Sequence, residues 1–304
     1  MALTSIISVN YNQPLVTLEF LKSVKRNTIG EDVELILVDN GSHMDYGETF
    51  KSIYPELIYI RSKENLGFAG GNNLGIEKSQ GEFLLFLNND TELTENFVGT
   101  LMSEFMQNPN IGLLSPLILY HEDKTKIQYA GYTEMNYLTG RNKTIGSLES
   151  DNNQFLDKSE ETGFVHGAAM MCKRIDLESV GLMEENYFLY YEEMDWCEKF
   201  RKAGKKIWFT GKAKIYHKES ISVGKDSSLK IYFMFRNRML FIRKNTNLLN
   251  TAVFGLYYIG LVCPGTALKY LLNGRKDLIP WIFQGLIWNC FNSKTSMNLG
   301  YKLF

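Results

Sequence analysis

The chain has 304 residues, of which 44% are hydrophobic and 22% charged, which fits one large globular domain with or without an appendage and excludes a disordered or fibrous protein. The net charge of −1 argues against a general nucleic-acid-binding protein. That sum hides a segregation, because residues 201–304 hold eighteen basic and three acidic residues, whereas residues 1–200 hold fifteen basic and thirty-one acidic ones.

The first 90 residues alternate apolar runs with amphipathic segments, and a helix is predicted after Pro14. Short buried strands are predicted at residues 5–9, 34–38, 57–60 and 83–87. This alternation predicts a mostly parallel sheet, whose ligands bind beyond the carboxyl ends of the strands. Polar clusters that follow three of these strands, at 10–12, 39–42 and 88–90, should therefore lie near one crevice.

The remaining residues divide into an irregular middle, a second region of strands and helices, and a helical tail. Residues 120–160 are polar and predict an antiparallel excursion. Strands are then predicted at 164–172 and 206–209, and helices at 175–180 and 192–203. Residues 225–304 are helical and apolar in pattern, interrupted by basic residues.

The sequence Asn88-Asn89-Asp90 directly follows an apolar run. A carboxylate exposed at the end of a buried strand is well placed to hold a divalent cation over the phosphates of a ligand. The alternative is that Asp90 or Thr91 caps a helix that begins near Glu95.

Residues 65–73, NLGFAGGNN, are dense in glycine and asparagine. Such a loop lets backbone N–H groups approach phosphates or a base. Its spacing differs from GxGxxG, which disfavours a dinucleotide site. A tight turn that starts a helix is the structural alternative.

Three carboxylates, Glu192, Glu193 and Asp195, fall within one turn of a predicted helix. Clustered carboxylates repel one another, which raises the pKa of one of them and makes it a usable general base. The alternative is a solvated acidic first turn, which the helix dipole favours. The aromatic residues at 187–191 and Trp196 argue against full solvation.

Two histidines, His166 and His217, lie beside predicted strands. A lone histidine is ordinarily structural or merely exposed, and metal ligation is the alternative. Spacing alone leaves both interpretations open.

Seven motifs occur in order between residues 5 and 240, over about three quarters of the chain. They are SIISVNYNQP (5–14), LVDNGS (37–42), ENLGFAGGNN (64–73), FLNND (86–90), HGAAMMCKR (166–174), GLMEENYFLYYEEMDWCEKFRKAG (181–204) and KIYHKESIS (214–222). Together they resemble the inverting family 2 glycosyltransferases, especially bacterial enzymes of the rhamnosyltransferase type. The resemblance implies an α/β GT-A fold with a mostly parallel central sheet and a helical C-terminal extension. It divides the chain into a catalytic domain (1–224), with a nucleotide-binding part (1–115) and an acceptor-binding part (116–224), and a tail (225–304).

The resemblance also implies roles for individual residues. Asp39 would accept the N3–H of uracil or thymine and so select pyrimidine nucleotides. Asp90 would hold Mg²⁺ or Mn²⁺ on the donor diphosphate, with His217 as the second protein ligand. The other positions that would line the nucleotide are Asn10, Asn65, Gly67, Gly71, Asn73 and Asn89.

The family's acidic pair places the catalytic base at Glu193, which would deprotonate an acceptor hydroxyl in one inverting displacement. Asp195 remains an alternative base, and Glu192 completes the cluster. The sequence departs from the family twice, with Asn-Asn-Asp where many relatives carry two aspartates and Glu-Glu where Glu-Asp is commoner.

The expected reaction moves a sugar from a pyrimidine nucleotide-sugar, first dTDP-rhamnose and then a UDP-hexose or galactofuranose donor. The expected acceptor is a glycan or polyprenyl-diphosphate-linked glycan in cell-surface polysaccharide synthesis. A sugar nucleotidyltransferase would need a Gly- and Arg-rich loop after the first strand, where this chain has NYNQP. A non-catalytic binding protein should lack Asp90 or the carboxylate cluster, and both are present.

The tail predicts contact with a membrane. The 24 residues between Lys244 and Lys269 carry no charge, a length that could span a bilayer, and residues 278–293 form a shorter uncharged stretch. Apolar segments with Trp and Tyr among basic residues suit helices lying in an anionic membrane surface. A true span, a buried helical subdomain or a homo-oligomer contact are alternatives. Scattered cysteines and an N-terminus without a secretory signal predict a cytoplasmic protein, peripheral on the inner face of the plasma membrane.

Overall fold

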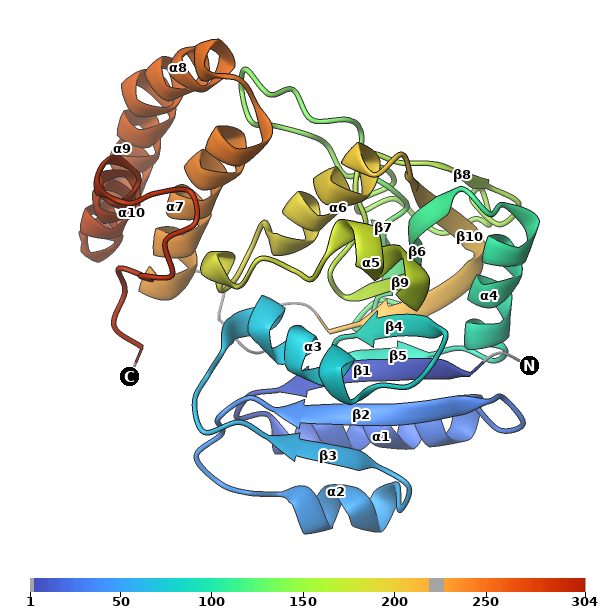
Figure 1. Ribbon diagram of the computed structural model, residues 1–304. Coiled ribbons are helices and arrows are strands. Elements are labelled where there is room, and N and C mark those ends of the chain that lie inside the picture. Colours follow the sequence, from blue (N-terminus) through green and yellow to red (C-terminus); the bar gives the residue numbers. More distant parts are fainter. Residues whose placement is uncertain (1–2, 219–226, 304) are drawn as a thin grey trace.

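The computed structural model describes residues 3–218 and 227–303, and in these ranges ten strands form one mixed sheet with helices on both faces (Figure 1). The strand order is β3-β2-β1-β4-β9-β6-β10-β5, with β7 beside β6 and β8 beside β10. The strands are β1 (Thr4–Asn10), β2 (Val33–Asp39), β3 (Ile58–Arg61), β4 (Phe83–Leu87), β5 (Thr91–Leu93), β6 (Ile111–Tyr120), β7 (Ile127–Tyr129), β8 (Ser159–Glu161), β9 (Ala169–Lys173) and β10 (Lys206–His217).

The N-terminal half of the sheet is parallel, as its apolar runs predict. β1 pairs in parallel with β2 and β4, and β2 pairs in parallel with β3. The register places Asn10 opposite Asp39, so the polar residues that end these two strands lie at the same edge of the sheet.

Beyond β4 the sheet is mixed. β9 runs antiparallel between β4 and β6, whereas β6 and β10 are parallel to each other. The strand predicted from residue 164 begins only at Ala169, because a turn precedes it in which His166 Nδ1 accepts a hydrogen bond from the N–H of Ala168 at 3.1 Å. A helix does begin near Glu95, at Phe97, but its N-cap is Asn96. The alternative cap at Asp90 or Thr91 is wrong, since Thr91–Leu93 pairs with β10 as β5.

The helices cover both faces of the sheet, because alternate strand residues point to opposite sides. Ile7 of β1 belongs to one apolar core with residues of α6 and α7, and Ile6 to a second core with residues of α1 and α4. The helices are α1 (Pro14–Asn27), α2 (Gly47–Ile53), α3 (Gly67–Lys78), α4 (Phe97–Gln107), α5 (Leu177–Val180), α6 (Glu192–Lys202), α7 (Ser228–Asn245), α8 (Leu248–Tyr257), α9 (Cys263–Leu272) and α10 (Ile279–Phe291).

The C-terminal helices gather on one side of the molecule, shown in orange and red in Figure 1. α7 packs against the rest of the chain, where Phe241 contacts Tyr191 and Phe164 ring to ring. α8 and α9 join through a π-helical turn into one helix, Leu248–Leu272, which is long and apolar enough to cross a membrane, with mean hydropathy 1.5 and 22% of its most apolar window buried. The predicted boundary after residue 224 lies outside the described residues.

Candidate active site

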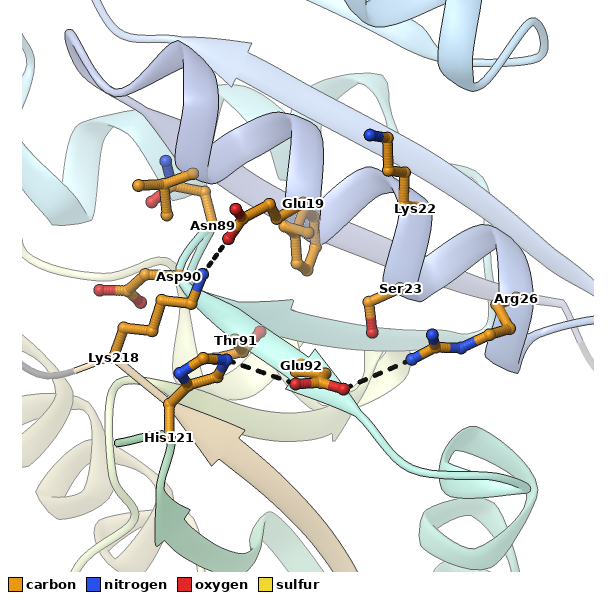
Figure 2. Close-up of a pocket in the computed structure, with 12 residues that line it drawn as sticks. Glu19, Lys22, Ser23, Arg26, Asn89, Asp90, Thr91, Glu92, His121 and Lys218 are labelled. Carbon is orange, nitrogen blue, oxygen red and sulfur yellow. Dashed lines mark hydrogen bonds and ion pairs between the residues drawn. The ribbon is translucent and has the colours of Figure 1, made fainter. Parts of the chain in front are cut away.

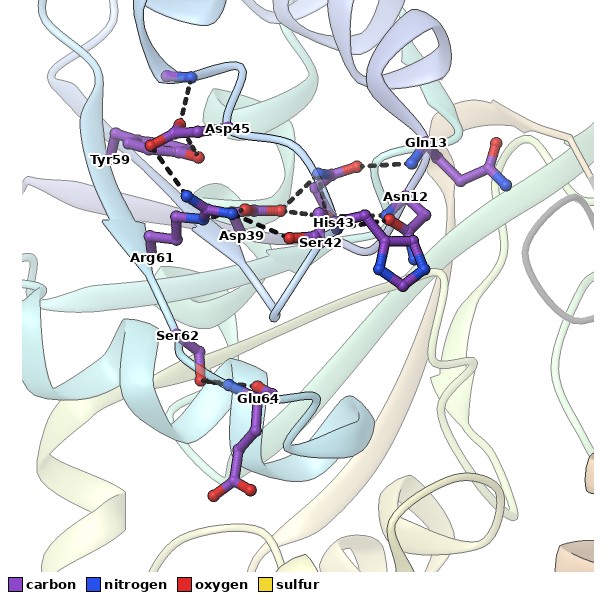
Figure 3. Close-up of polar contacts among 12 residues, drawn as sticks. Asn12, Gln13, Asp39, Ser42, His43, Asp45, Tyr59, Arg61, Ser62 and Glu64 are labelled. Carbon is purple, nitrogen blue, oxygen red and sulfur yellow. Dashed lines mark hydrogen bonds and ion pairs between the residues drawn. The ribbon is translucent and has the colours of Figure 1, made fainter. Parts of the chain in front are cut away.

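Asp39, the last residue of β2, is buried at the edge of the sheet with 1% of its surface exposed. Its Oδ1 accepts hydrogen bonds from Asn10 Nδ2 at 2.9 Å and from the hydroxyl of Ser42. Its Oδ2 lies 3.3 Å from Nε of Arg61, and Figure 3 shows Arg61 between Asp39 and Asp45. Apart from this ion pair with Arg61, Oδ2 has no hydrogen-bond partner among the described residues, so a lone pair remains for an N–H from a ligand.

A chain of hydrogen bonds connects Asp39 with the next predicted cluster. Asn10 Oδ1 accepts from the hydroxyl of Thr17 at 3.0 Å, and the Thr17 oxygen accepts from Asn89 Nδ2 at 2.8 Å. Asn10, Asp39 and Asn89 are therefore brought together, although they follow three different strands.

The loop at 65–73 forms the start of α3, where Asn65 Oδ1 accepts hydrogen bonds from the N–H of Gly67 and from Asn40 Nδ2. Gly67 has a φ of +72°, and a Cβ there would lie 2.1 Å from the carbonyl oxygen of Phe188. A Cβ at Gly71 would lie 2.9 Å from a methyl carbon of Val9. The observed role of both glycines is close packing, and backbone contact with a nucleotide stays a prediction.

Asn73 requires a correction. Its side chain is buried, and Nδ2 donates to the carbonyl of Met183 and to Glu185 Oε1, both at 2.9 Å. Its Oδ1 accepts from the N–H of Met183 at 3.2 Å. The amide predicted to line the nucleotide instead braces the segment that leads to the acidic cluster.

Asp90 and His217 meet at the end of β4 and β10. Oδ1 of Asp90 lies 3.2 Å from Nε2 of His217, is buried, and has no hydrogen-bond partner among the described residues. Two neighbouring ligands of an octahedral Mg²⁺ or Mn²⁺ lie about 3 Å apart when each bond is about 2.1 Å long. The spacing of Asp90 and His217 therefore fits two neighbouring ligands of a divalent cation.

Gln128 supports His217 from behind. Its Oε1 lies 2.8 Å from Nδ1 of His217, which fixes the ring and directs Nε2 toward Asp90. Metal-binding histidines ordinarily have such a partner on the second ring nitrogen. Over the described ranges no group of three or more His, Cys, Asp or Glu side chains gathers as a metal site, so further ligands would come from the bound molecule or from water.

A pocket of about 340 Å³ opens beside Asp90, between α1 and β5 (Figure 2). Lys218 reaches into it and forms an ion pair with Glu19, while its N–H donates to the Asp90 carbonyl at 3.0 Å. Glu92 on the far side is paired with Arg26 and His121. The residues that line the pocket are Val16, Glu19, Phe20, Lys22, Ser23, Arg26, Asn89, Asp90, Thr91, Glu92, His121 and Lys218.

His166 lies between the Asp90–His217 pair and the acidic cluster. Its ring centre is 5.8 Å from that of His217, and burial, together with the nearby His217, lowers the pKa of His166 to about 3. The next residue, Gly167, lies close to Glu193, because a Cβ at position 167 would be 4.0 Å from Cγ of Glu193. The turn at 166–167 thus joins the two groups of candidate residues.

The three carboxylates of α6 have different environments. Glu192 is buried, and burial with the neighbouring Glu193 charge raises its pKa well above the usual range. Glu193 is only partly exposed, and burial raises its pKa to about 7, against the opposing effect of backbone N–H groups of the first turn. The solvated acidic turn is therefore wrong.

Asp195 already has protein partners. Its Oδ1 accepts from the hydroxyl of Tyr187 at 2.9 Å and from Asn245 Nδ2 at 2.7 Å, and the side chain is buried. Because these contacts tie Asp195 to Tyr187 and to the end of α7, Glu193 is the carboxyl with the pKa and exposure of a general base.

Comparison with known proteins identifies the class. The model of glycosyl transferase family 2 matches residues 5–179, and the chain belongs to this family. Solved structures support the GT-A fold: GalNAc-T7 with UDP, GalNAc and Mn²⁺ superposes with a TM-score of 0.61 at 15% identity, covering 78% of this chain and 49% of that one. The mannosyltransferase PcManGT of Pyrobaculum calidifontis, with GDP-Man and Mn²⁺, gives 0.58 at 13% identity, covering 95% and 87%.

Curated relatives share the family at low identity. The hexosyltransferase Agl10 of low-salt glycan biosynthesis in Haloferax volcanii is 29% identical over 78% of this chain and 74% of its own length. The N-acetylglucosaminyl-diphospho-decaprenol L-rhamnosyltransferase of Mycobacterium tuberculosis is 23% identical over 78% and 83%. The dTDP-rhamnosyl transferase RfbF of Shigella flexneri is 24% identical over 79% of each chain. The protein is thus a family 2 glycosyltransferase with rhamnosyltransferase relatives.

Proposed function

We propose that the protein is an inverting, metal-dependent glycosyltransferase that uses a pyrimidine nucleotide-sugar, with dTDP-rhamnose as the first candidate. The proposed acceptor is a glycan or a polyprenyl-diphosphate-linked glycan of cell-surface polysaccharide synthesis. One observation carries the proposal: the Asp90–His217 pair lies between Asp39 and Glu193. The donor atoms of the pair are 3.2 Å apart, and the pKa of Glu193 is about 7.

Asp39 would read the base of the donor. Its Oδ2, which is ion-paired with Arg61 but accepts no hydrogen bond, can accept the N3–H that uracil and thymine carry, while Arg61 and Asn10 hold the carboxylate in place. This contact serves UDP- and dTDP-sugars alike, so a UDP-hexose or galactofuranose donor is the second candidate. The names of the rhamnosyl-transferring relatives favour rhamnose.

Asp90 and His217 would hold the divalent cation, and Gln128 would keep the His217 ring in the tautomer that presents a lone pair at Nε2. A bound Mg²⁺ or Mn²⁺ would supply a Lewis acid that stabilises the charge on the departing nucleoside diphosphate.

Glu193 would act as the base. Its carboxylate takes the proton from an acceptor hydroxyl, and that oxygen forms a bond to the anomeric carbon from the face opposite the diphosphate. The bond from the anomeric carbon to the diphosphate oxygen breaks in the same displacement, so the configuration inverts. A pKa near 7 suits this task, because the carboxyl is both ionised and basic enough at neutral pH.

A sugar nucleotidyltransferase is the alternative enzyme. It is disfavoured because the turn after β1 carries Asn10, Asn12 and Pro14 and no glycine that would admit a triphosphate. The buried carboxyl at Glu193 also has no evident task in nucleotidyl transfer.

We further propose that α8–α10 lie on an anionic membrane surface, which would place the protein on the inner, cytoplasmic face of the plasma membrane. α10 exposes Phe283, Ile287 and Phe291 at helical spacing, and the helix over α8 and α9 exposes leucines such as Leu256 and Leu268. Exposed lysines flank these apolar faces and would pair with acidic headgroups: Lys269, Lys276, Lys294 and Lys302.

Thermal stabilisation by nucleotide-sugars tests the proposed donor. UDP-, dTDP- and GDP-sugars are compared with and without Mn²⁺. The proposal expects the largest shift with a pyrimidine nucleotide-sugar and only in the presence of the metal. Preference for a GDP-sugar would contradict the role of Asp39, and shifts that ignore Mn²⁺ would contradict the role of Asp90.

A further inference from the structure

The segment just before Glu193 has an unusual backbone. Phe188, Tyr190 and Tyr191 have positive φ angles of 65°, 70° and 75°. Bulky L-residues rarely adopt this region, because their side chains crowd the backbone there. Neighbouring groups must therefore hold the segment in place.

Asn237 of α7 provides such a hold. Its side chain is fully buried, and Nδ2 lies 2.8, 2.8 and 2.9 Å from the carbonyl oxygens of Tyr187, Leu189 and Tyr190. The adjacent Arg236 donates to Asn237 Oδ1 at 2.7 Å and so orients the amide. The two amide hydrogens of one asparagine from the C-terminal helices thus serve three carbonyls of the segment, and one of the hydrogens is shared between two carbonyls.

Arg236 is itself fixed. It is fully buried, donates to the carbonyl of Asn186 at 2.8 Å, and stacks on the ring of Trp288 at 3.9 Å. A buried guanidinium with these partners forms a rigid support for the Asn237 amide.

The other side of the segment contacts the start of α3. The carbonyl of Phe188 accepts a hydrogen bond from the N–H of Phe68 at 2.7 Å, next to Gly67. The segment then leads into α6, whose first helical hydrogen bond runs from the N–H of Asp195 to the carbonyl of Tyr191 at 2.9 Å. Fixing residues 187–190 therefore fixes the direction in which α6 starts and the position of Glu193.

We infer that Asn237 is a positioning residue for Glu193: it holds the carbonyls of residues 187–190 so that the Glu193 carboxyl is kept at the crevice beside Gly167. The inference rests on the proposed role of Glu193 as base. It makes the first helix of the C-terminal extension part of the catalytic apparatus, rather than only a link to a membrane.

The surroundings of Glu193 determine its pKa and therefore the acidic limb of the pH–rate profile. The titratable groups that interact with its carboxyl are Glu192 and Cys197 of α6, Tyr190 and Tyr191 of the preceding segment, and Tyr132 after β7. If the segment loosens, water reaches the carboxyl and the acidic limb of the pH–rate profile moves to lower pH. A loss of folded protein alone would leave that limb where it is.

The test compares Asn237→Ala and Asn237→Ser with a control on the same helix. Arg243→Gln removes hydrogen bonds to Asn289 and Asn292 of the α10 region and leaves residues 186–191 untouched. For Asn237→Ala we expect kcat to fall about 100-fold, with the KM for the donor unchanged and the acidic limb lower by on the order of one pH unit. Asn237→Ser, whose hydroxyl can donate to one carbonyl, should lie between Ala and wild type.

Wild-type kcat in Asn237→Ala, or a fall equal to that of Arg243→Gln with an unmoved pH profile, would overturn the inference. If Asn237→Ala does not fold, the serine variant decides, with amide hydrogen exchange at Asp195 as a second measurement. Fast exchange at Asp195 is expected in Asn237→Ser and not in Arg243→Gln, and equal protection in the two would contradict the inference. Glu193→Gln is assayed alongside to separate the two proposals. If Glu193→Gln turns over at the wild-type rate, the assignment of Glu193 as base fails. If Glu193→Gln is inactive but Asn237→Ala has wild-type kcat, only the role of Asn237 is refuted.

Discussion

Nε2 of His217 lies 3.2 Å from Oδ1 of Asp90, although Asp90 follows β4 and His217 ends the distant strand β10. The antiparallel register of β5 and β10 brings them together, because His217 pairs with Thr91, the residue next to Asp90. The geometry of the proposed metal site is thus a consequence of strand pairing.

Gln128 should control how well this site holds a metal. Replacing Gln128 with Leu removes the partner of His217 Nδ1 while keeping a similar volume. We expect the apparent affinity for Mn²⁺, measured by calorimetry in the presence of nucleoside diphosphate, to fall about 10- to 100-fold. High Mn²⁺ should restore most of the turnover. An unchanged Mn²⁺ affinity would show that the His217 ring needs no such support.

The strand pattern alone predicts the polar clusters that hold Asp39 and Asp90 at one edge of the sheet. The roles of Asp39 and His217 come only from the resemblance to the family, because spacing alone leaves His217 open. Gln128 could not be predicted, since it lies in a three-residue strand within the irregular middle of the chain and its partner is 89 residues away. The resemblance predicts Asn73 at the nucleotide, because a sequence motif does not distinguish an amide that binds a ligand from one that donates to the carbonyl of Met183.

In the C-terminal tail, too, the sequence predicted the elements but not the buried polar contacts. Its charge and apolar content predicted helices and an exposed apolar face, and both are present. The sequence does not predict that Arg236 and Asn237 of α7 are buried, because a basic residue among apolar ones ordinarily lies at the surface. Likewise, the choice between Glu193 and Asp195 required the contacts of Asp195 with Tyr187 and Asn245.

The raised pKa of Glu193 has consequences for both activity and stability. The protonated carboxyl cannot accept a proton, so kcat/KM should fall as the pH drops below about 7. Burying the ionised carboxyl opposes folding. This cost is absent below the ordinary pKa of 4.5, grows as the pH rises toward 7, and is fully present above it.

Glu193→Gln should therefore melt a few degrees higher than wild type at pH 8 and at the same temperature at pH 4. Calorimetry at the two pH values checks this. Glu178→Gln, at an exposed carboxylate of α5, serves as the control and should shift neither melting temperature. Equal melting temperatures of Glu193→Gln and wild type at pH 8 would contradict the buried environment of Glu193.

Asp39→Ala should weaken the binding of UDP and dTDP about 10- to 100-fold, because a hydrogen bond to a charged group is worth about 1.5–3 kcal/mol. GDP binding should change little, so the preference for pyrimidines should shrink. Asp45→Ala, which alters the same Arg61 network at an exposed position, is the matched control. If Asp39→Ala keeps the full pyrimidine preference, another residue reads the base.

The exposed face of α10 should govern binding to lipid. Wild-type protein should sediment with vesicles of phosphatidylglycerol and phosphatidylethanolamine and be released by high salt, whereas vesicles of phosphatidylcholine alone should bind it weakly. Replacing Phe283, Ile287 and Phe291 with Ser should abolish sedimentation, while Leu15→Ser, at an exposed position of α1, should not. Unchanged sedimentation of the triple variant, or its conversion from an oligomer to a monomer without an effect on lipid binding, would refute the membrane assignment.

The central claim is that Asp90 and Glu193 act in one transfer reaction, and labelled sugar transfer tests it most directly. The nucleotide-sugar that stabilises the protein most is supplied, with Mn²⁺, to the protein and to cell membranes that contain lipid-linked glycans. The account predicts that wild type transfers label, whereas Asp90→Ala and Glu193→Gln lose at least about 100-fold, with Glu193→Gln still stabilised by the donor. Transfer by Glu193→Gln at the wild-type rate, or by Asp90→Ala with its metal dependence intact, would contradict it.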